Sequence, residues 1–252
     1  MKKVEWTMLF GAPIKSPDDI TRLRRMGFDF GEIAMASAQA RRMWLESGVV
    51  NGSAGKFFLT AHGPLEHAPN DAKNLWNRYI PRLVATIDIL NRMCVNSLNI
   101  HLVVDKRVVS SIVLGEKIRA LRQLVEYGKR NSVAINLENL TETADDLDLV
   151  LNAAPDLGIT LDVGHANLHG LENISISIID RLGQLIRHVH LHDNRGGTGQ
   201  HDDLHLPIGH GRVEFKPIIT SLCDMGYRGT MTFEVKPEYQ EAGRIRIQNL
   251  VT

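Results

Sequence analysis

The chain contains little cysteine. Only Cys94 and Cys223 occur among its 252 residues, and they lie far apart with no CxxC spacing. This excludes a disulfide framework of the kind that stabilises small secreted domains. We therefore expect a protein of a reducing compartment, the cytoplasm.

Long apolar runs and net charge are also missing. No apolar run approaches the ~18 residues of a membrane span. In the N-terminal MKKVEWTMLFGAP, Glu5, Gly11 and Pro13 interrupt any apolar segment of a signal peptide. Lys plus Arg and Asp plus Glu number 29 each, so no overall charge attracts nucleic acid or an anionic membrane, although a local basic patch is compatible with this balance. We expect no membrane partner.

What is present is an alternation of short apolar runs with longer helical stretches. Strands are predicted at 4–10, 28–34, 57–62, 96–103, 133–138, 158–163, 185–191 and 229–235, and helices at 16–26, 72–93, 111–130, 143–154 and 214–225. Ser16 before Pro17, and Thr143 with Asp146, are typical of helix N-termini. Eight strand-helix units in about 250 residues indicate an α/β fold, a (β/α)8 TIM barrel. No linker divides the chain, so we expect one domain over 1–252, with a short or irregular last helix at 238–250.

Period-two patterns separate two faces on several predicted strands. In SLNIHLV (97–103), Leu98 and Ile100 share one face while Asn99 and His101 share the other. FFLTAH, VAINLENL, GITLDV and GTMTFEV repeat the scheme, and each polar face ends in a histidine or a carboxylate. Active sites of TIM barrels are built where the strands end.

The residues at these strand ends can ligate a metal. They are His62, His101, Glu138, Asp162, His190 and Glu234, to which adjoining loops add His165, Asp203 and His205. One such histidine alone is more often a structural residue, but nine acids and imidazoles at one barrel mouth would be costly to bury without a cation. Nitrogen and oxygen donors without thiolate predict Zn²⁺ or Mn²⁺, with Fe²⁺, Co²⁺ or Mg²⁺ as alternatives, in one to three ions.

Histidines are concentrated in one segment, because 188–211 holds six of the eleven and the first 61 residues hold none. Beside its ligands, His192 with Asp193 is expected to contact substrate or to orient a ligand. Glu32 on the second predicted strand is expected either to reach the pocket or to pair with a neighbouring arginine. The remaining histidines are expected behind the ligands or at the surface; they are His67, His169, His188, His201 and His210.

The joint order of these motifs resembles the xylose-isomerase-like TIM-barrel superfamily, which includes endonuclease IV and many sugar isomerases and epimerases. The motifs are His62-Gly-Pro, His101, Leu137-Glu138-Asn139, Leu161-Asp162-Val-Gly-His165, His190-Leu-His-Asp193, Asp203-Leu-His205, Gly209-His-Gly211 and Phe233-Glu234. The resemblance to endonuclease IV implies three metal positions. These are His62, His101 and Glu138 for the first, Glu138, Asp162, His190 and Glu234 for the second, and His165, Asp203 and His205 for the third.

Two activities fit this pocket. The first is isomerisation or epimerisation of a small sugar, sugar phosphate or polyol-derived ketone through an enediolate, with Glu138 and Glu234 as bases and His165 near the substrate oxygens. The second is hydrolysis of DNA at abasic sites by a trinuclear zinc centre, as the resemblance to endonuclease IV implies. The nine ligands favour this second activity, since a one-metal isomerase has no evident use for all of them.

Departures from endonuclease IV favour the small-substrate enzyme. Leu65 stands in the loop after His62 where endonuclease IV has tyrosine, and Leu102-Val103 replace its Pro-Gly. The loop GPLEHAPND (63–71) carries two acids and no Arg or Lys, whereas a DNA-facing loop should be basic. Basic pairs near strand ends occur only at 41–42 and 106–107, where they are expected to be solvated or to hold a substrate phosphate. A catalytically silent metal-binding barrel would not need two opposed glutamates.

Overall fold

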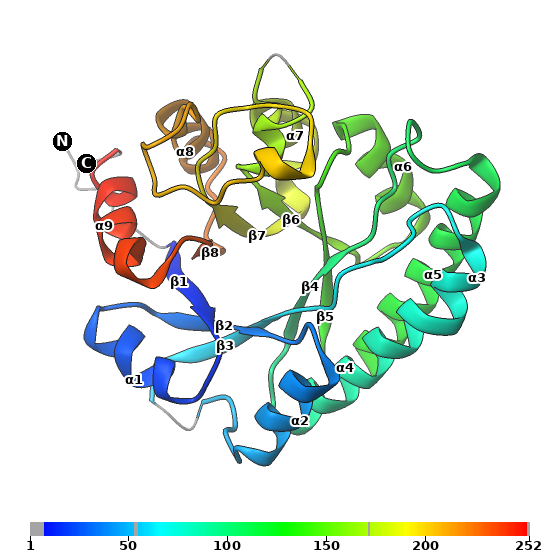
Figure 1. Ribbon diagram of the computed structural model, residues 1–252, viewed down its shortest axis with the longest axis horizontal. Coiled ribbons are helices and arrows are strands. Elements are labelled where there is room, and N and C mark those ends of the chain that lie inside the picture. Colours follow the sequence, from blue (N-terminus) through cyan, green and yellow to red (C-terminus); the bar gives the residue numbers. More distant parts are fainter. Residues whose placement is uncertain (1–7, 53–54, 171, 251–252) are drawn as a thin grey trace.

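The strands of the computed structural model form one closed barrel (Figure 1). The structure describes residues 8–52, 55–170 and 172–250. All neighbouring strands pair in parallel and in chain order, and β8 closes the barrel against β1. The strands are β1 (Leu9–Ile14), β2 (Phe30–Ala34), β3 (Phe58–His62), β4 (Ser97–His101), β5 (Ala134–Glu138), β6 (Gly158–Asp162), β7 (Ile186–Leu191) and β8 (Thr230–Phe233). The predicted TIM-barrel architecture is confirmed.

Helices surround the barrel. In the described part of the chain they are α1 (Asp18–Arg25), α2 (Ala38–Glu46), α3 (Ala72–Asn74), α4 (Ile80–Arg92), α5 (Ser111–Arg130), α6 (Ala144–Ala153), α7 (Ser175–Leu182), α8 (Phe215–Asp224) and α9 (Pro237–Gln248). A π-helical turn, Leu75–Tyr79, joins α3 to α4, so the helix predicted at 72–93 is one continuous helical segment. Among these described helices, none has the length and apolar character needed to cross a membrane.

The first strand differs from its prediction at 4–10. Positions 4–7 lie outside the described residues, and β1 continues past residue 10 to Ile14. The sequence pattern ended this strand early because glycine and proline usually interrupt strands. Gly11 pairs with Phe30 on β2, and glycine is needed at this strand position because a Cβ would lie only 2.4 Å from the Phe30 ring.

Two helix starts were predicted from capping residues, with different outcomes. Thr143 and Asp146 form a reciprocal capping box at α6, as expected. At α1, Pro17 occupies the N-cap position and no side chain caps it, so Ser16 is not the cap. Asp19 orders this start instead, because its Oδ2 accepts the backbone N–H of Ser16 at 3.2 Å.

The last helix, α9, is regular over 12 residues, not short or irregular as expected. The sequence pattern missed its regularity because polar residues supply part of its buried face. Gln240 is buried, accepts a hydrogen bond from Arg22 Nη1 at 2.9 Å and donates one to the carbonyl of Val235 at 3.3 Å. A polar contact of this kind leaves no signal in hydropathy.

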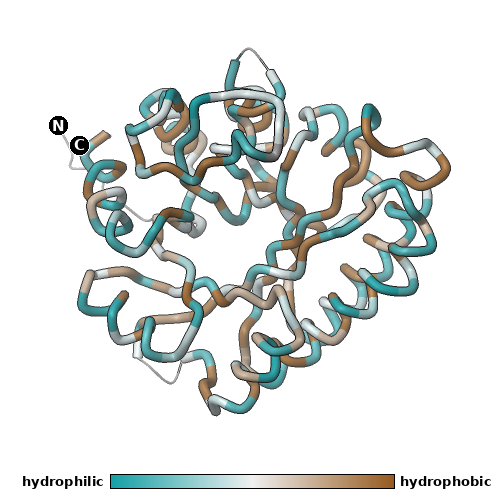
Figure 2. The backbone as a smooth tube through the Cα atoms, in the orientation of Figure 1, coloured by the Kyte–Doolittle hydropathy of each residue, from teal (hydrophilic) through white to brown (hydrophobic). Residues whose placement is uncertain are grey.

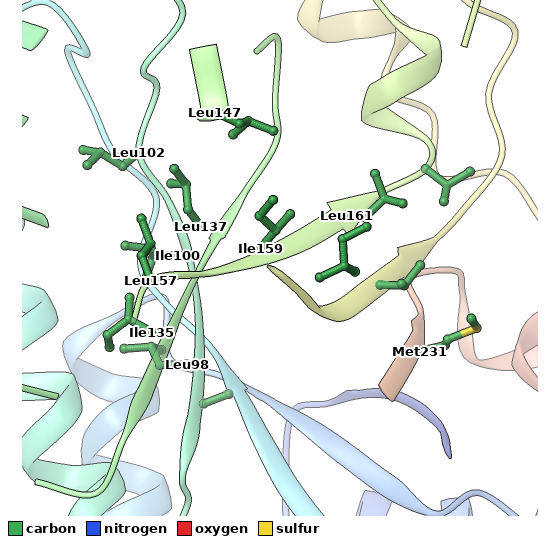
Figure 3. Close-up of a cluster of buried hydrophobic side chains, with 14 of the residues drawn as sticks. Leu98, Ile100, Leu102, Ile135, Leu137, Leu147, Leu157, Ile159, Leu161 and Met231 are labelled. Carbon is green, nitrogen blue, oxygen red and sulfur yellow. The ribbon is translucent and has the colours of Figure 1, made fainter. Parts of the chain in front are cut away.

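The apolar strand faces point outward into a core shared with the helices. Leu98, Ile100, Ile135 and Leu137 on β4 and β5 are at most 1% exposed. Figure 3 shows them beside the equivalent residues of β6, with Leu147 of α6 in the same cluster. In Figure 2, hydrophobic and hydrophilic segments alternate along the outer helices, whose apolar sides complete this core.

The opposite strand faces form a polar interior. Asn99 on β4 donates to Glu32 Oε1 on β2 at 2.6 Å and accepts from Thr160 on β6 at 2.8 Å and from Asn136 on β5 at 3.0 Å. These contacts join strands that are not all neighbours, so they cross the inside of the barrel. TIM-barrel interiors are usually filled by branched apolar side chains. Here a hydrogen-bonded floor of polar groups lies inside instead.

A buried ion pair fastens two of the loops that follow strands β3 and β4. Lys117 on α5 and Glu66 after β3 approach to 2.8 Å, and their side chains are 0% and 3% exposed. Lys117 also donates to the carbonyl of Val103, while Glu66 accepts the N–H of the same residue. The pair thus ties the segment after His62 to the segment after His101.

Replacing Lys117 by methionine is expected to destabilise the fold by about 3–5 kcal/mol, because it leaves the Glu66 carboxylate buried and unpaired. Urea unfolding measures the change. The double variant with Glu66→Gln should recover part of the loss. Lys129→Met, which removes an exposed pair with Asp156, is the matched control and should leave the midpoint unchanged. Equal midpoints for Lys117→Met and the wild type would contradict the expectation.

Candidate metal centre

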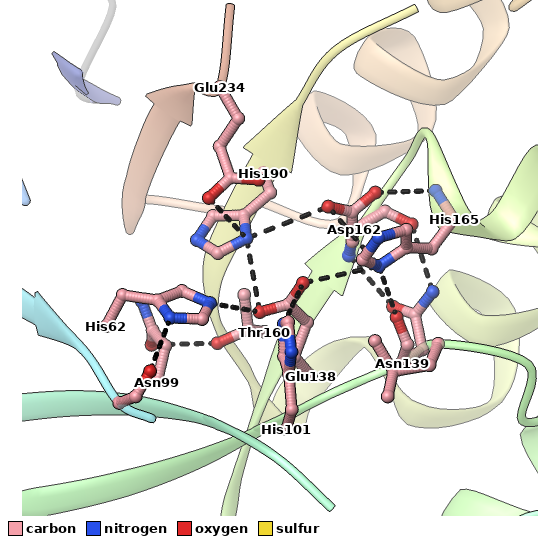
Figure 4. A network of polar contacts seen from close by, with 12 residues as sticks. His62, Asn99, His101, Glu138, Asn139, Thr160, Asp162, His165, His190 and Glu234 are labelled. Carbon is pink, nitrogen blue, oxygen red and sulfur yellow. Dashed lines mark hydrogen bonds and ion pairs between the residues drawn. The ribbon is translucent and has the colours of Figure 1, made fainter. Parts of the chain in front are cut away.

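All nine predicted metal ligands gather at the C-terminal ends of the strands. Figure 4 shows them with the exception of Asp203 and His205. Strand geometry positions most of them. His62, His101, Glu138 and Asp162 are the last residues of β3, β4, β5 and β6, His190 lies near the end of β7, and Glu234 follows β8. His165 opens a short 3-10 helix after β6, and Asp203 and His205 lie in the loop between β7 and α8.

Glu138 lies at the centre of the cluster and is 1% exposed. Its Oε1 is 3.1 Å from His101 Nε2 and 3.3 Å from His165 Nδ1. Its Oε2 is 3.1 Å from His62 Nε2 and 3.3 Å from His190 Nδ1. A carboxylate with imidazoles beside both oxygens is arranged to bridge two cations.

His190 faces a second set of carboxylates. Its Nδ1 is 3.5 Å from Glu234 Oε1 and 3.7 Å from Asp162 Oδ2, in addition to its approach to Glu138. Three carboxylates from three strands therefore surround one imidazole nitrogen. These four residues are the second predicted set of ligands.

Asp203 is the centre of the third set. Its Oδ2 is 3.2 Å from His205 Nε2 and 3.4 Å from His165 Nε2. The loop after β7 therefore folds back over the barrel mouth, as the prediction of a third position requires. The structure adds His192 to this set, within 4.8 Å of the other three donors.

Several buried oxygen and nitrogen atoms of the cluster, all able to ligate a metal, make no hydrogen bond. They are Glu138 Oε1, Asp162 Oδ2, His190 Nδ1 and Asp203 Oδ1, together with both ring nitrogens of His192. Buried polar atoms are rarely left unsatisfied, because desolvation without a partner costs about 1–3 kcal/mol for each group. Carboxylate and imidazole atoms that face one another in this way fit divalent cations, which would satisfy them together.

The ligand rings are held by their other nitrogens. Nδ1 of His62, His165 and His205 lies 3.1, 3.0 and 2.8 Å from the carbonyls of Gly63, Asn139 and Glu234. Donation from Nδ1 to these carbonyls directs each Nε2 at a carboxylate of the cluster, where it can ligate a metal once it has lost its proton. Such partners set the tautomer and the orientation of metal-binding histidines.

Glu32 neither lines the surface of the pocket nor pairs with an arginine. It is 2% exposed and lies beneath the cluster, with its carboxylate 3.3 Å from His190 Nε2 and 3.4 Å from His188 Nε2. A carboxylate behind an imidazole raises the basicity of that ligand. Glu32 is therefore arranged to orient His190. His188, expected only as one of several accessory histidines, is fully buried here and contacts Thr230 and Thr232 as well.

Asp193 shapes the loop and does not line the pocket. We expected it to contact substrate, but it is fully buried. Its oxygens accept the backbone N–H groups of Asn194, Gly209, Gly211 and Val213 at 2.8–3.1 Å. These bonds leave its carboxylate engaged in folding the segment that carries Asp203 and His205. Neighbouring His192 is fully buried too, with Nε2 3.1 Å from Asp162 Oδ1.

Comparison with protein families shows to which family the chain belongs. The model of the xylose isomerase-like TIM barrel family matches residues 20–248. The chain belongs to this family. The match covers every strand of the barrel except β1, and it includes all nine candidate ligands.

The curated relatives carry the names of different enzymes. A probable endonuclease 4 of Thermosipho africanus is 29% identical over 159 residues, covering 55% of this chain and 55% of that protein. Fructoselysine 3-epimerase of Escherichia coli O157:H7 is 26% identical over 144 residues, covering 54% and 50%. The chain thus spans about half the length of the curated relatives it matches. Both relatives are enzymes by name.

Solved structures show the same fold. A D-tagatose 3-epimerase-like protein superposes with a TM-score of 0.77 at 22% identity, and the alignment covers 97% of each chain. At this identity the likeness supports the barrel architecture alone.

Metal binding by this family member is expected to release protons at pH 7. Burial lowers the pKa of His62, but the hydrogen bond to Glu138 and the charge of that carboxylate outweigh burial and raise the pKa to about 9. His205 behaves likewise, since its hydrogen bond to Asp203 and the charge of Glu234 overcome burial and raise its pKa to about 9. A protonated imidazole cannot ligate a metal.

The apparent affinity should therefore increase with pH and level off above about 9, where these imidazoles are already neutral in the metal-free protein. Titration calorimetry at pH 7 in two buffers of different ionisation enthalpy counts the protons released. If the binding heat at pH 7 were identical in both buffers, no proton would be released, which would contradict the protonated state of His62 and His205. The same pair of titrations at pH 10 serves as the control, and the contribution from His62 and His205 should vanish there.

Proposed function

We propose that this protein is a metal-dependent isomerase or epimerase of a small sugar, sugar phosphate or polyol-derived ketone. One observation carries the proposal. The carboxylates of Glu138 and Glu234 approach the same atom, His190 Nδ1, at 3.3 and 3.5 Å from different strands. Two carboxylates on different sides of one position suit removal of a proton from one face of a carbon and its return to the other.

The Glu138, Asp162, His190 and Glu234 set would hold the cation that this chemistry needs. A bound divalent cation supplies Lewis acidity, which lowers the pKa of the C–H bond beside the substrate carbonyl and stabilises the enediolate charge. Zn²⁺ or Mn²⁺ suits the nitrogen and oxygen donors, with Fe²⁺, Co²⁺ or Mg²⁺ as alternatives.

The proton transfers belong to the two glutamates. Glu234, which is 16% exposed at its side chain, would take the proton from the carbon next to the carbonyl, and the electron pair of the C–H bond would pass to the carbonyl oxygen. Glu138, starting this step in its protonated form, would give its proton to the opposite face of the carbon as the electron pair returns from the enediolate oxygen. Glu234 is then left protonated and Glu138 ionised, so the carbon is inverted with no net oxidation. His165 would contact the substrate oxygens. A positioned base contributes roughly 10²–10⁴-fold to such a step.

Family relationships support the same chemistry. The relative named for fructoselysine is a 3-epimerase by name, and the structural neighbour is named a D-tagatose 3-epimerase-like protein. Epimerisation beside a ketone is the reaction that an opposed pair of carboxylates would perform. Carbohydrate-like ketones are therefore the first substrates to test.

Exchange of substrate hydrogen with solvent tests the proposal. The metal-loaded protein is incubated in deuterated water with a panel of ketoses, aldoses and inososes, and deuterium at the carbon next to the carbonyl is measured by mass spectrometry. We expect exchange with at least one class, and a decrease of roughly 10²-fold or more in Glu234→Gln. Glu238→Gln, an exposed change four residues away on α9, is the matched control. The proposal would be refuted if no substrate in the panel exchanged its hydrogen and Glu234→Gln were therefore indistinguishable from the wild type.

Hydrolysis of DNA at abasic sites is the second candidate, favoured by the convergence of all nine ligands and by the endonuclease 4 relative. The basic residues near the strand ends oppose it because they are already engaged. Arg41 donates to the carbonyl of Met35, Arg42 pairs with Glu46, and Arg107 pairs with Asp105. Cleavage of a duplex with a single abasic site at low salt, lost in Glu138→Gln, would reverse our preference.

A further inference from the structure

We propose that Arg41 and Arg82 form a phosphate-binding subsite at the rim of the barrel mouth, and that the substrate is therefore a sugar phosphate. The inference deepens the isomerase or epimerase activity proposed above and rests on it. Arg41 lies on α2 and Arg82 on α4, two helices that pack against each other (Figure 1). Their guanidinium groups would hold the phosphate while the carbonyl end of the substrate lies at the metal centre.

Both guanidinium groups are positioned by the segment that follows β2. Arg41 Nη1 donates to the carbonyl of Met35 at 3.1 Å. Arg82 Nη2 donates to the carbonyl of Ala36, the next residue, at 2.9 Å. Met35 in turn donates its N–H to the carbonyl of His62, the last residue of β3, at 2.8 Å. The two arginines therefore lie at the C-terminal end of the barrel, beside a strand that carries a candidate metal ligand.

The charge of Arg82 also reaches the end of β4. The hydroxyl of Tyr79 donates to the carbonyl of His101, the last residue of that strand. Burial raises the pKa of Tyr79 well above its usual value, and the positive charge of Arg82 opposes this increase. The arginine pair thus borders the strands of His62 and His101, which are candidate ligands of the first metal position.

Neither arginine has an acidic partner in the part of the chain that the structure describes. Arg41 is only 9% exposed, and buried cations are almost always paired. Burial and the positive charge of Arg82 both lower the pKa of Arg41, and its bond to a carbonyl orients the side chain without neutralising it. The adjacent Arg42 differs, because it pairs with Glu46 at 2.7 Å. Two cations held together without an anion are arranged to receive one.

The chemistry of the pair favours a phosphate monoester. Such a group carries a charge of about −1.5 to −2 at pH 7, which two guanidinium groups can neutralise, whereas a carboxylate would leave a positive charge unpaired. Each guanidinium presents N–H groups in a planar fork that matches phosphate oxygens, and each uses one of its nitrogens on a carbonyl. Ala36 and Ser37 are exposed, so a phosphate can arrive from solvent. A DNA backbone would instead need cations at several successive phosphates.

The start of α2 adds to the positive potential beside the pair. The helix begins at Ala38, two residues after Ala36, and has no acidic residue in its first turn. The first N–H groups of a helix lack intrahelical partners and stabilise a nearby anion. The helix start therefore supports the anion that the two arginines would bind.

Calorimetric titration of the metal-loaded protein with inorganic phosphate tests the subsite without any substrate. In Arg82→Gln the affinity for phosphate should fall roughly 10-fold or more, because charge-assisted hydrogen bonds are lost. Arg41→Gln should have the same effect, with circular dichroism to verify its fold. Arg42→Gln, the same change at the neighbouring exposed residue, is the matched control and should bind phosphate like the wild type. Unchanged affinity in Arg82→Gln, or equal wild-type affinity for acetate and phosphate, would overturn the proposal.

Paired substrates test whether the subsite serves the reaction. Deuterium exchange is measured for a pentulose 5-phosphate and for the free pentulose. Binding energy from a phosphate that does not react positions the reacting carbon, so the ratio of kcat/KM for the two substrates should favour the phosphate. This ratio should fall roughly 10-fold or more in Arg82→Gln. The same ratio in the variant and the wild type would overturn the assignment.

The two measurements distinguish failure of the subsite from failure of the proposed function. Phosphate binding that depends on Arg41 and Arg82 is measured whether or not a sugar exchanges its hydrogen. Absence of exchange would therefore count against the enzyme activity alone. Tight binding of a duplex with an abasic site, lost in Arg82→Gln, would assign the pair to nucleic acid and overturn the choice of a sugar phosphate.

Discussion

Replacing Glu138 by glutamine is expected to abolish both metal loading and proton exchange. The carboxylate lies within 3.3 Å of four imidazole nitrogens, so the substitution removes a negative charge that two of the proposed metal positions would share. The loss of a base alone should lower the exchange rate about 10²–10⁴-fold, and loss of the cation should lower it further. Elemental analysis and the deuterium assay measure the two effects on one preparation.

Glu126→Gln is the matched control for this prediction, because it makes the same chemical change at an exposed site on α5. It should retain both metal and activity. Circular dichroism of both variants verifies that the barrel is folded. Wild-type metal content in Glu138→Gln would contradict the bridging role, and wild-type exchange would contradict its role as a base.

Removal of the metal is expected to lower the melting temperature of the protein by roughly 8–16 °C for each tightly bound ion. A ligand present at 1,000 times its Kd stabilises the folded state by about 4 kcal/mol. Each kcal/mol corresponds to about 2–4 °C for a chain of this size. The metal-free site also leaves carboxylates and imidazoles buried with unsatisfied atoms. Calorimetry with and without a chelator measures the difference.

Restoring Zn²⁺ or Mn²⁺ after chelation should recover the melting temperature, and the more effective ion indicates which metal the site prefers. The Glu138→Gln variant should respond much less to the chelator than the wild type does. A wild-type melting temperature that is insensitive to chelation, after elemental analysis has verified that the metal is gone, would contradict a metal held by the folded barrel.

The barrel and most of its candidate ligands could be predicted from local patterns. Alternation in strands such as 97–101 determines which side chains face the helices and which face the interior, because successive side chains point to opposite faces. Chain order then places the polar strand ends at one mouth. The same rules could not place β1 correctly, since they treat Gly11 as a break, whereas in the barrel it pairs with β2 and leaves room for the Phe30 ring.

Contacts across the barrel were beyond local patterns. Glu32 contacts His190, which is 158 residues away in sequence and on a strand that does not neighbour β2. Nothing near Glu32 in sequence distinguishes a residue that orients a ligand from one that pairs with an arginine. The hydrogen bonds of Asp193 likewise depend on the path of the loop, which brings the backbone N–H groups of Gly209, Gly211 and Val213 to its carboxylate.

His188, His190 and His192 show where the two sources of information divide. The sequence by itself determined that these three histidines share one face of the seventh strand and of the residue that follows it, since they occur at every second position. The tertiary structure decided their roles, because each successive residue rises about 3.3 Å and the three rings therefore lie at different depths. His188 contacts Thr232 deep inside the barrel, and His190 contacts the carboxylate of Glu138 at the centre of the cluster. His192 lies 3.8 Å from Asp203 in the loop after β7. Only the closed barrel brings a different set of partners to each depth.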